Sequence, residues 1–459
     1  MKINRLGPIT KSDLTLNNLT IFTGNNNQGK TYMSYAIYGI LKAFEEIDLD
    51  FYSMEESYFL SNHGSFSISV EEFQSRITKR YKEKISNDWI DILKENFQTD
   101  YSTFSNSKIV IAESDIINLF KFSLSKNKNY KTNIKYKNFT ITLTLKNEIF
   151  EFTYLLENIA IKFKDNDDDN ADVIHTMMLI MTESFMKQSL TAFYIPAERV
   201  GLNVFRSQLN SNKIKLLDTL TQHFNSQGDL EIEKPFEELK PYLAKPINDY
   251  LKFINGINKY DIDDSDNSLG KFIREKLIKG RFDVDKNSDK SFFRSKHGSK
   301  KYKKEIIPLH ITSSSIKSFY GLDYYLEHLN TSIATNFLII DEPEMNLHPS
   351  AQIEFVNFLE LLLSNNIKVI ISTHSDFLIK KIQNLALRNH YNSTNKVIGI
   401  IEKNISLYNF ADNSIKKVDI FSEDEYTNFS DTINELELEF FDALDEKIKI
   451  ENNIKEDKE

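Results

Sequence analysis

Cysteine is absent from the 459-residue sequence, and tryptophan occurs only once. Without cysteine there are no disulfide bridges, thiolate metal sites or cysteine nucleophiles, so the chemistry must come from oxygen and nitrogen groups, as fits a reducing compartment. Long apolar runs are absent as well. None approaches the roughly 18 residues of a membrane span, and the first residues, "MKINRLGPIT", lack a signal-peptide stretch. We therefore expect a soluble, cytoplasmic protein without a membrane segment.

Most of the chain also lacks an excess of charge of either sign. The net charge is −10, yet residues 422–459 alone carry 14 acidic and 4 basic side chains and account for all of it. An acidic tail of this kind is most often a solubilising end, and less often a regulatory arm that competes for a basic groove. The balanced charge of the remaining residues neither requires nor excludes binding to DNA.

Glycine is scarce, with 13 in the whole chain, but two occur in the stretch "TGNNNQGKTY" at residues 23–32. The spacing is that of a phosphate-binding loop, whose backbone N–H groups surround phosphates while its lysine and hydroxyl reach the phosphate oxygens and Mg²⁺. A strand-like run, "LTIF", precedes it and a helix-like run, "TYMSYAIYGILKAF", follows, which disfavours a chance glycine turn. We expect an ATP or GTP site formed by Gly24, Asn25, Asn26, Asn27, Gln28, Gly29, Lys30, Thr31 and Tyr32, with Thr31 also a metal ligand.

An acidic pair ends a second apolar run, "FLIIDEPEMNLHP" at residues 337–349. Asp341 at the end of a strand can hold Mg²⁺, and Glu342 beside it can orient and deprotonate the attacking water. Alone the pair is a weak signal, because strands often end in a solvated acid, but the phosphate-binding loop strengthens it. In "VIISTHS", His374 ends another buried strand, where it can contact the γ-phosphate or serve as a core histidine.

Three serines, Ser313, Ser314 and Ser315, precede a predicted helix in "LHITSSSIKSFYGLDYYL" at residues 309–326. Hydroxyl and free N–H groups at a helix N-terminus can bind an anion. The alternative is an ordinary serine cap. The sequence therefore offers a third phosphate-binding element, distant along the chain from the first.

The order of the predicted elements indicates one α/β core built from both ends of the chain. Residues 1–41 predict a strand, a turn, a second strand, the phosphate-binding loop and a helix; residues 336–375 predict a strand, a loop, a helix and a strand. Because the run "NFLIID" and the loop have to be neighbours in one sheet, the roughly 270 residues between them must be insertions. Alternation in "YKNFTITLTLKNEIFEFTYLL" predicts strands, and "DNDDDN" at 165–170 predicts a solvated loop. Helical periodicity dominates at about 172–190 and 206–280, where prolines argue against long coiled-coil arms: Pro235, Pro241 and Pro246.

The four motifs in this order, the phosphate-binding loop, the serines before a helix, "DEPE" with "NLHP", and "STHS", resemble the ABC-type ATPases of the OLD, SMC and Rad50 group. The runs "YIPAERVGL" (194–202), "IPLHITSSSIKS" and "THSDFLIK" narrow the resemblance to prokaryotic anti-phage defence ATPases similar to AriA of PARIS systems. The resemblance covers the two ends of the core well and the insertions poorly. It implies ATP and Mg²⁺ as cofactors and gives a role to each of these residues: Lys30 and Thr31 as phosphate and Mg²⁺ ligands, Asp341 as the Walker B aspartate, Glu342 as the catalytic base and His374 as the switch histidine.

The resemblance also implies that Ser313 and Ser314 meet the γ-phosphate held by the opposite protomer of a dimer. Ser315 departs from the pattern, because many relatives have a glycine after the paired serines. This puts close backbone approach to the phosphate in doubt and points to slow or gated hydrolysis. No residue can be assigned to the usual Gln loop. Glu198 and Arg199 are candidates for a role near the site or, equally, for a structural salt bridge.

The fold class implied is α/β, an ABC-type P-loop ATPase core with a β-rich subdomain and a large helical insertion. The expected boundaries are 1–44 and 306–421 for the two parts of the core, 45–205 for a mixed β/α insertion, 206–305 for a helical insertion with a basic hairpin, and 422–459 for the acidic tail. Only 85 residues follow His374, too few for a metal-binding Toprim domain, so we expect no nuclease in this chain.

The predicted function is an ATP-hydrolysing sensor of an anti-phage system. It would form a dimer or a larger ring-like assembly, control a Toprim-type effector nuclease encoded nearby, and respond to a phage-encoded trigger protein. The alternatives are a DNA-repair or DNA-clamp ATPase similar to SMC, Rad50 or RecF and, less favoured, a transporter ATPase. The stretch 286–304 has eight Lys or Arg residues among three aromatics. It predicts a site for nucleic acid or an acidic protein, or simply an exposed charged hairpin.

Overall fold

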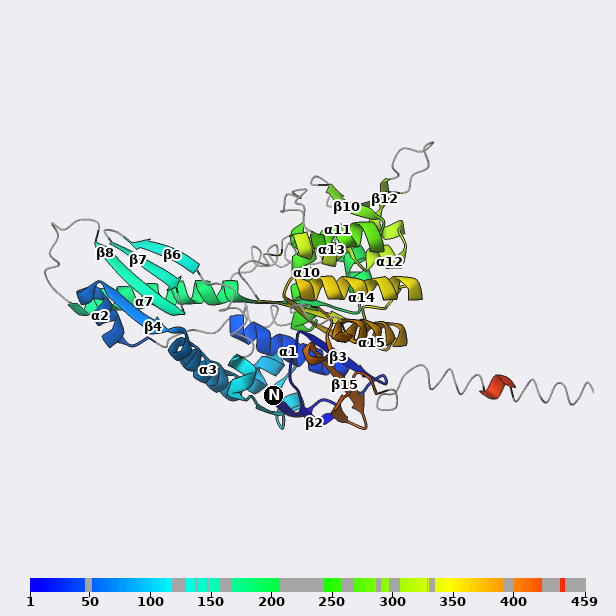
Figure 1. Cartoon of the computed structure of the whole chain (residues 1–459), viewed down its shortest axis with the longest axis horizontal. Coiled ribbons are helices and arrows are strands. Elements are labelled where there is room, and N and C mark those ends of the chain that lie inside the picture. Colours follow the sequence, from blue (N-terminus) through cyan, green and yellow to red (C-terminus); the bar gives the residue numbers. More distant parts are fainter. Residues whose placement is uncertain are drawn as a thin grey trace, which may run out of the picture.

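A nine-stranded mixed sheet forms the centre of the molecule (Figure 1). The computed structural model describes residues 1–45, 52–117, 129–136, 139–146, 148–156, 167–206, 243–257, 268–285, 290–296, 306–327, 329, 335–391, 399–422 and 438–441. The strand order is β5-β1-β2-β16-β15-β3-β14-β13-β9. Their bounds are β1 Lys2–Leu6, β2 Ile9–Asp13, β3 Leu19–Gly24, β5 Lys108–Val110, β9 Leu190–Ile195, β13 Thr335–Asp341, β14 Ile367–Ser372, β15 Ile405–Ala411 and β16 Ser414–Val418.

Five neighbouring strands of this sheet, from β15 to β9, run parallel. Their nearly continuous apolar sequences fit strands that are buried on both faces. The expectation that the "NFLIID" strand neighbours the phosphate-binding strand is wrong by one strand, because β14 lies between β3 and β13. After β13, the chain crosses over through α14 (Pro349–Ser364) and re-enters the sheet as β14, on the side of β13 that faces β3. All residues of β14 are buried, as expected for a central strand.

Helices cover both faces of the sheet, so the core has three layers. On one face, Phe337 and Ile339 of β13 pack in the same cluster as α1 (Lys30–Glu45). On the other face, Leu338 and Ile340 pack with α14 and α15 (Asp376–Tyr391). This alternation is the two-residue period of a strand with two buried faces. The carboxyl ends of β3, β14, β13 and β9 therefore meet at one edge, where ligands of open α/β sheets bind.

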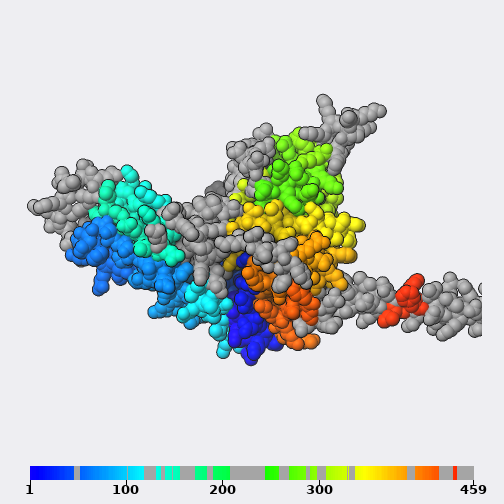
Figure 2. Space-filling model, viewed as in Figure 1, coloured from blue at the N-terminus to red at the C-terminus, as the bar shows by residue number. Residues whose placement is uncertain are grey.

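A second body, formed mainly by residues 52–104, 129–136, 139–146, 148–156 and 167–189, projects from the core (Figure 2). We call it the arm. It contains the strands predicted by alternation, and the bounds of its elements are α2 Met54–His63, β4 Ser65–Ser69, α3 Val70–Asn87, α4 Trp89–Phe97, α5 Tyr101–Phe104, β6 Asn129–Tyr136, β7 Phe139–Lys146, β8 Ile149–Leu156 and α7 Asp167–Ser189. The loop predicted at 165–170 is wrong for residues 167–170, because α7 begins at Asp167. Acidic residues are favourable in a first helical turn, since they interact with the helix dipole.

Two strands of the core sheet, β5 and β9, come from the range 45–205 that the sequence suggested as an insertion. The core therefore draws on three parts of the chain rather than two. β9 forms one edge of the sheet and pairs only with β13 among the described strands, in register from Thr335↔Leu190 to Ile340↔Ile195. The segment "YIPAER" begins in the last residues of β9, so it lies beside the carboxyl end of β13.

A smaller lobe lies above α14 in Figure 1. Its elements are α10 Lys245–Gly256, α11 Ser268–Phe272, the π-helix η2 Ile273–Leu277, β10 Gly280–Asp285, β11 Lys290–Ser295, β12 Ile306–Pro308, the 3₁₀-helix η3 Leu309–Ile311, α12 Ser314–Lys317 and α13 Tyr320–Glu327. The described part of the range 206–280 is mainly helical, as predicted, and Pro246 lies in the first turn of α10, where proline is tolerated. Pro235 and Pro241 lie outside the described residues.

The basic stretch 286–304 is described only at residues 290–296, which contain β11; this strand pairs antiparallel with β10. Two of its cations are neutralised locally: Arg294 pairs with Asp283 at 2.8 Å and Lys296 with Glu275 at 3.2 Å. The described part thus matches the charged-hairpin interpretation. The acidic tail lies outside the described residues apart from a short helical turn at 438–441. Among the described helices, none combines the length and apolar character needed to cross a bilayer.

Candidate nucleotide-binding site

The stretch from Gly24 to Lys30 joins β3 directly to α1, as the motif requires. Three of its residues have positive φ: Gly24 at 119°, Asn27 at 61° and Gly29 at 95°. A Cβ at Gly24 would lie 2.2 Å from the carbonyl oxygen of Phe410, so only glycine fits there. Left-handed residues before a helix N-terminus form the backbone geometry of an anion-binding concavity. The loop therefore has the shape needed to receive phosphate.

Lys30 lies over this loop with only 7% of its surface exposed. Its Nζ donates to the carbonyl oxygens of Gly24 and Asn25, both at 2.8 Å. Burial lowers the pKa of Lys30 to about 8, an effect partly offset by the carboxylates of Glu342 and Asp341. A bound phosphate would replace two neutral acceptors by charged oxygens, a stronger partner for an ammonium group.

Asp341 ends β13 and is 4% exposed. Hydroxyl groups from the two flanking strands hold its carboxylate: Tyr194 of β9 donates to Oδ2 at 3.0 Å, and Ser372 of β14 donates to Oδ1. Burial raises the pKa of Asp341, while hydrogen bonds from Ser372, Tyr194 and Thr31 lower it. Thr31 therefore lies beside Asp341. A carboxylate and a hydroxyl oxygen are hard donors that suit Mg²⁺, so these two residues fit the predicted metal site.

Glu342 follows in the left-handed region, with φ of 45°. Its N–H donates to the Ser372 carbonyl oxygen at 3.0 Å, which fixes the turn to the end of β14. The side chain is half-buried. Burial and the neighbouring Asp341 raise the pKa of Glu342, whereas Lys30 and Arg199 oppose the rise. A raised pKa suits a carboxylate that has to accept a proton from water.

Glu344 joins this segment to His374. Its Oε1 accepts from the Thr373 hydroxyl at 2.8 Å and from the His374 backbone N–H at 2.7 Å. His374 is half-buried, and burial together with the charge of Lys30 lowers its pKa to about 4. The imidazole is therefore neutral near pH 7. The backbone N–H of Thr373 donates to the Phe22 carbonyl oxygen of β3 at 2.9 Å, so His374 lies beside the strand that leads into the phosphate-binding loop.

The three serines occupy a different place. Ser313 caps α12, accepting from the Ile316 N–H at 3.3 Å, and Ser318 donates to the Ser315 carbonyl oxygen at 2.7 Å. Ser313 and Ser314 are exposed. In Figure 1, α12 belongs to the lobe above α14, whereas β3 and α1 lie below it. The structure thus brings together Lys30, Thr31, Asp341, Glu342 and His374, but leaves the serines in the other lobe.

Sequence reasoning missed several residues at this edge of the sheet, namely Tyr194, Ser372, Thr373 and Glu344. All follow or end parallel strands, so their position at strand ends was the available signal. Arg199, named only as a candidate, is buried and donates to backbone carbonyl groups of residues 196 and 341–343. It forms no salt bridge within the described part of the chain. Glu198 is exposed.

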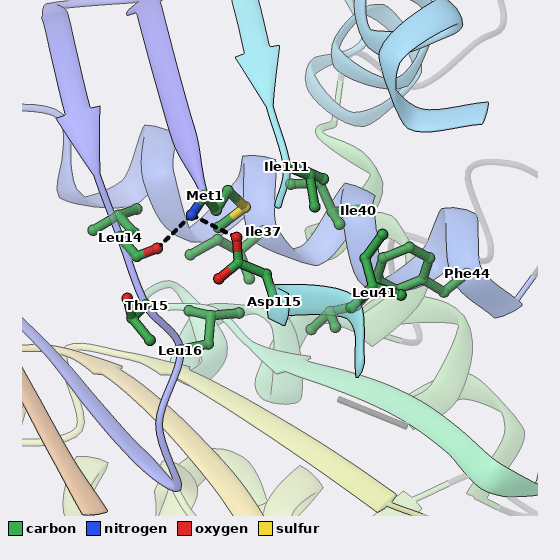
Figure 3. A pocket seen from close by; sticks show the side chains of 11 residues that line it. Met1, Leu14, Thr15, Leu16, Ile37, Ile40, Leu41, Phe44, Ile111 and Asp115 are labelled. Carbon is green, nitrogen blue, oxygen red and sulfur yellow. Dashed lines mark hydrogen bonds and ion pairs between the residues drawn. The ribbon is translucent and has the colours of Figure 1, made fainter. Parts of the chain in front are cut away.

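An apolar pocket beside α1 is not part of this site (Figure 3). It is lined by Ile37, Leu41 and Phe44, and the Met1 amino group pairs there with Asp115 at 2.8 Å. Its cavity of about 30 Å³ is far too small for a nucleotide. The phosphate-binding loop and the strand ends around it remain the candidate site.

The chain belongs to the AAA_15 family of AAA ATPase domains, whose model matches residues 1–379. It is therefore an α/β P-loop ATPase, and its substrate is ATP. ATP hydrolysis in P-loop proteins uses Mg²⁺, in keeping with the oxygen donors of Thr31 and Asp341. No curated protein matches the chain significantly.

Three solved structures, all SMC head domains, are similar over nearly the whole chain. One, from Pyrococcus furiosus, has an extended coiled coil and is bound to the C-terminal domain of ScpA; it is 13% identical, with a TM-score of 0.33, covering 95% of this chain and 97% of that one. A second head, bound to the C-winged helix domain of ScpA, is 10% identical, with a TM-score of 0.35 and coverage of 91% and 95%. The third, from Thermotoga maritima, is 9% identical, with a TM-score of 0.28 and coverage of 91% and 97%.

Proposed function

We propose that this ATPase is the nucleotide switch of an anti-phage defence system. ATP joins two copies of the chain, with Ser313 and Ser314 of one copy completing the site on the other, and hydrolysis separates them. The observation that carries this proposal is the division of the site: the phosphate-binding half is buried and held within the chain, while the serines stand exposed at the start of α12 in another lobe.

Within one copy, the proposed roles follow from position. Lys30 and the backbone of the loop bind the phosphates, and Thr31 and Asp341 hold Mg²⁺. Bound Mg²⁺ neutralises phosphate charge during the transfer. Glu342, whose pKa is raised by burial, accepts the proton of the attacking water. Neutral His374 donates a hydrogen bond to the γ-phosphate, and Glu344 holds the backbone on which His374 stands.

The switch controls a separate Toprim-type effector nuclease, encoded nearby, and responds to a phage-encoded trigger protein. This part rests on the resemblance of the four ordered motifs to the defence ATPases. The same resemblance extends the dimer to a larger ring-like assembly. The arm projecting from the core offers a surface on which an effector can be held (Figure 2).

The second candidate is a DNA-repair or DNA-clamp ATPase of the SMC or Rad50 type. The observation that favours it is that β11, in the described part of the basic stretch 286–304, belongs to the lobe that carries the serines. Against it, two of the three cations in the described part, Arg294 and Lys296, already pair with acidic neighbours. Paired surface cations contribute little to binding phosphate backbones, which depends on the release of counterions.

Coexpression with the adjacent reading frame tests the proposal. Phage protection should need both genes, and the Lys30→Ala variant should abolish protection although the partner is intact. The purified chain with ATP and Mg²⁺ should cut neither DNA nor RNA. Full protection by this gene alone, or nuclease activity of this chain alone, would contradict the partner model, and salt-sensitive DNA binding would favour the clamp instead.

A further inference from the structure

Arg199 packs against residues 341–344, which we call the acidic loop. Only 3% of its surface is exposed. Nη1 donates to the carbonyl oxygens of Asp341 at 2.9 Å and Pro196 at 3.2 Å, and Nη2 donates to those of Glu342 at 2.8 Å and Pro343 at 3.4 Å. A guanidinium presents its donors in a rigid planar fork. A single side chain therefore fixes three consecutive carbonyl groups of the acidic loop relative to one another.

The acidic loop needs these donors because the strand pairing stops beside it. β13 and β9 are in register up to Ile340 and Ile195. The next residue after β9 is Pro196, which has no N–H to continue the ladder. Glu342 then turns the chain through a left-handed conformation, which is strained for a residue with a side chain. Buried carbonyl groups without donors cost free energy, and Arg199 supplies the donors that the ladder does not.

We propose that Arg199 is a positioning residue for ATP hydrolysis. By holding the carbonyl groups of residues 341–343, it fixes the strained turn that places the Glu342 carboxylate near Lys30 and the phosphate-binding loop. This inference rests on the proposed role of Glu342 as the base. The competing interpretation is electrostatic only, in which the cation of Arg199 offsets the nearby carboxylates of Glu344, Asp341 and Glu342.

Arg206 provides a matched control within the same helical stretch, residues 199–206. It is also 3% exposed, and it donates to the Ile254 carbonyl oxygen at 2.7 Å and to the Ser291 hydroxyl at 2.9 Å. These partners belong to α10 and β11, in the smaller lobe. A change at Arg206 therefore removes contacts of the same kind, from a residue of the same burial, without touching the acidic loop.

The test compares Arg199→Lys and Arg199→Gln with Arg206→Lys in the full chain. Three quantities are measured: affinity for a fluorescent ATP analogue with Mg²⁺, kcat and KM for ATP, and hydrogen exchange of residues 342–347. The amides of Glu342, Met345 and Leu347 in that segment are hydrogen-bonded to backbone carbonyl groups. Lysine keeps the charge but not the fork, so in Arg199→Lys kcat should fall about 100-fold, as for a displacement of about 1 Å.

In the same variant, nucleotide affinity and KM should stay within about threefold of the unmodified chain, because the phosphate-binding loop is untouched. The rate of hydrogen exchange at residues 342–347 should rise about tenfold, which corresponds to a loss of roughly 1.4 kcal/mol of local stability. Arg206→Lys should leave kcat and this exchange unchanged. Arg199→Gln should resemble Arg199→Lys.

Normal kcat and exchange in Arg199→Lys would overturn the proposal in favour of the electrostatic interpretation. Equal losses in Arg206→Lys, or an Arg199→Lys chain that no longer binds the nucleotide, would show a general structural role instead. The Glu342→Gln variant separates the two levels of inference. If it hydrolyses ATP normally, the proposed base is wrong, whereas exchange at 342–347 in Arg199→Lys still decides whether Arg199 holds the loop.

Discussion

The two groups of residues that the motifs assign to the nucleotide and its Mg²⁺ differ in whether their partners lie within a single chain. Lys30 and Asp341 are 7% and 4% exposed, and neighbouring backbone and hydroxyl groups hold both. Ser313 and Ser314 are exposed, and the bond from the Ile316 N–H to Ser313 is an ordinary helix cap. A buried polar group has to find its partners within the chain, whereas an exposed helix start leaves room for a ligand on another molecule. This comparison fits the proposed division of the site into a finished half, formed by Lys30 and Asp341 with their partners in the same chain, and an outward half, formed by the exposed serines.

Changes at Lys30 and Glu342 should have the largest effects and should differ in kind. Lys30→Ala removes the charged donor to the phosphates, so ATP affinity should fall by at least about 100-fold, the value of two charge-assisted hydrogen bonds. Glu342→Gln keeps the phosphate-binding loop, so affinity should persist while kcat falls by roughly 100-fold to 10,000-fold. Separate measurements of binding and turnover check both. Normal turnover in Glu342→Gln would show that another group is the base.

The double variant Ser313→Ala, Ser314→Ala should sharpen the comparison. A single chain should bind ATP as before, because these serines lie outside its own phosphate-binding half, but ATP-dependent dimerisation and hydrolysis should fall by about tenfold or more, as expected for one or two lost charge-assisted hydrogen bonds. Ser69→Ala is the matched control, since Ser69 caps α3 by the same kind of bond, from the Glu72 N–H at 3.1 Å. Both variants lose a cap worth about 1 kcal/mol. Equal effects of the two would reduce the serines to caps.

Tyr194→Phe tests the finished half of the site with a smaller expected effect. It removes the hydroxyl that donates to Asp341 and leaves Ser372 in place. Loss of one hydrogen bond of about 1 kcal/mol should raise the Mg²⁺ concentration for half-maximal activity by a few-fold. Tyr250→Phe is the control, because Tyr250 is equally buried and donates to Asn203 instead, at 2.8 Å. An unchanged Mg²⁺ requirement in Tyr194→Phe would contradict the assignment of Asp341.

The smallest effect should come from His374 and pH. Its pKa is about 4 in the folded chain, against about 6.5 when unfolded, so the unfolded state binds more protons between these values. Stability should therefore fall as the pH drops through this window. Because the side chain is half exposed, we expect the contribution to be about 1 kcal/mol or less. His374→Asn should lose this part of the acid sensitivity in denaturant titrations at pH 7 and pH 4.5.

The finished half of the site was largely predictable from the sequence. A phosphate-binding loop needs specific residues at fixed spacing. An acidic residue directly after an apolar run marks the end of a buried strand. The sequence also predicted that the serines begin a helix. However, the sequence of a helix N-terminus is the same whether its serines only cap the helix or also bind a phosphate. Spacing alone could not decide which half they complete.

The placement of β9 and Arg199 could not be predicted in the same way. β9 lies in a range that looked like an insertion, and only the three-dimensional pairing with β13 shows that it belongs to the core sheet. Arg199 acts through backbone carbonyl groups, which leave no pattern in side-chain identity. The same holds for β14, whose place between β3 and β13 depends on the direction of a crossover and not on any residue within it.

Mixing two inactive variants tests most directly whether the site is shared between chains. Lys30→Ala lacks a working phosphate-binding half, and the Ser313→Ala, Ser314→Ala chain lacks the outward half. In a mixed dimer, the serines of the first complete the loop of the second. The account predicts that an equal mixture recovers up to about a quarter of normal ATP hydrolysis, since half the dimers are mixed and each has one complete site. Activity of the mixture no greater than the sum of the two variants alone would contradict it.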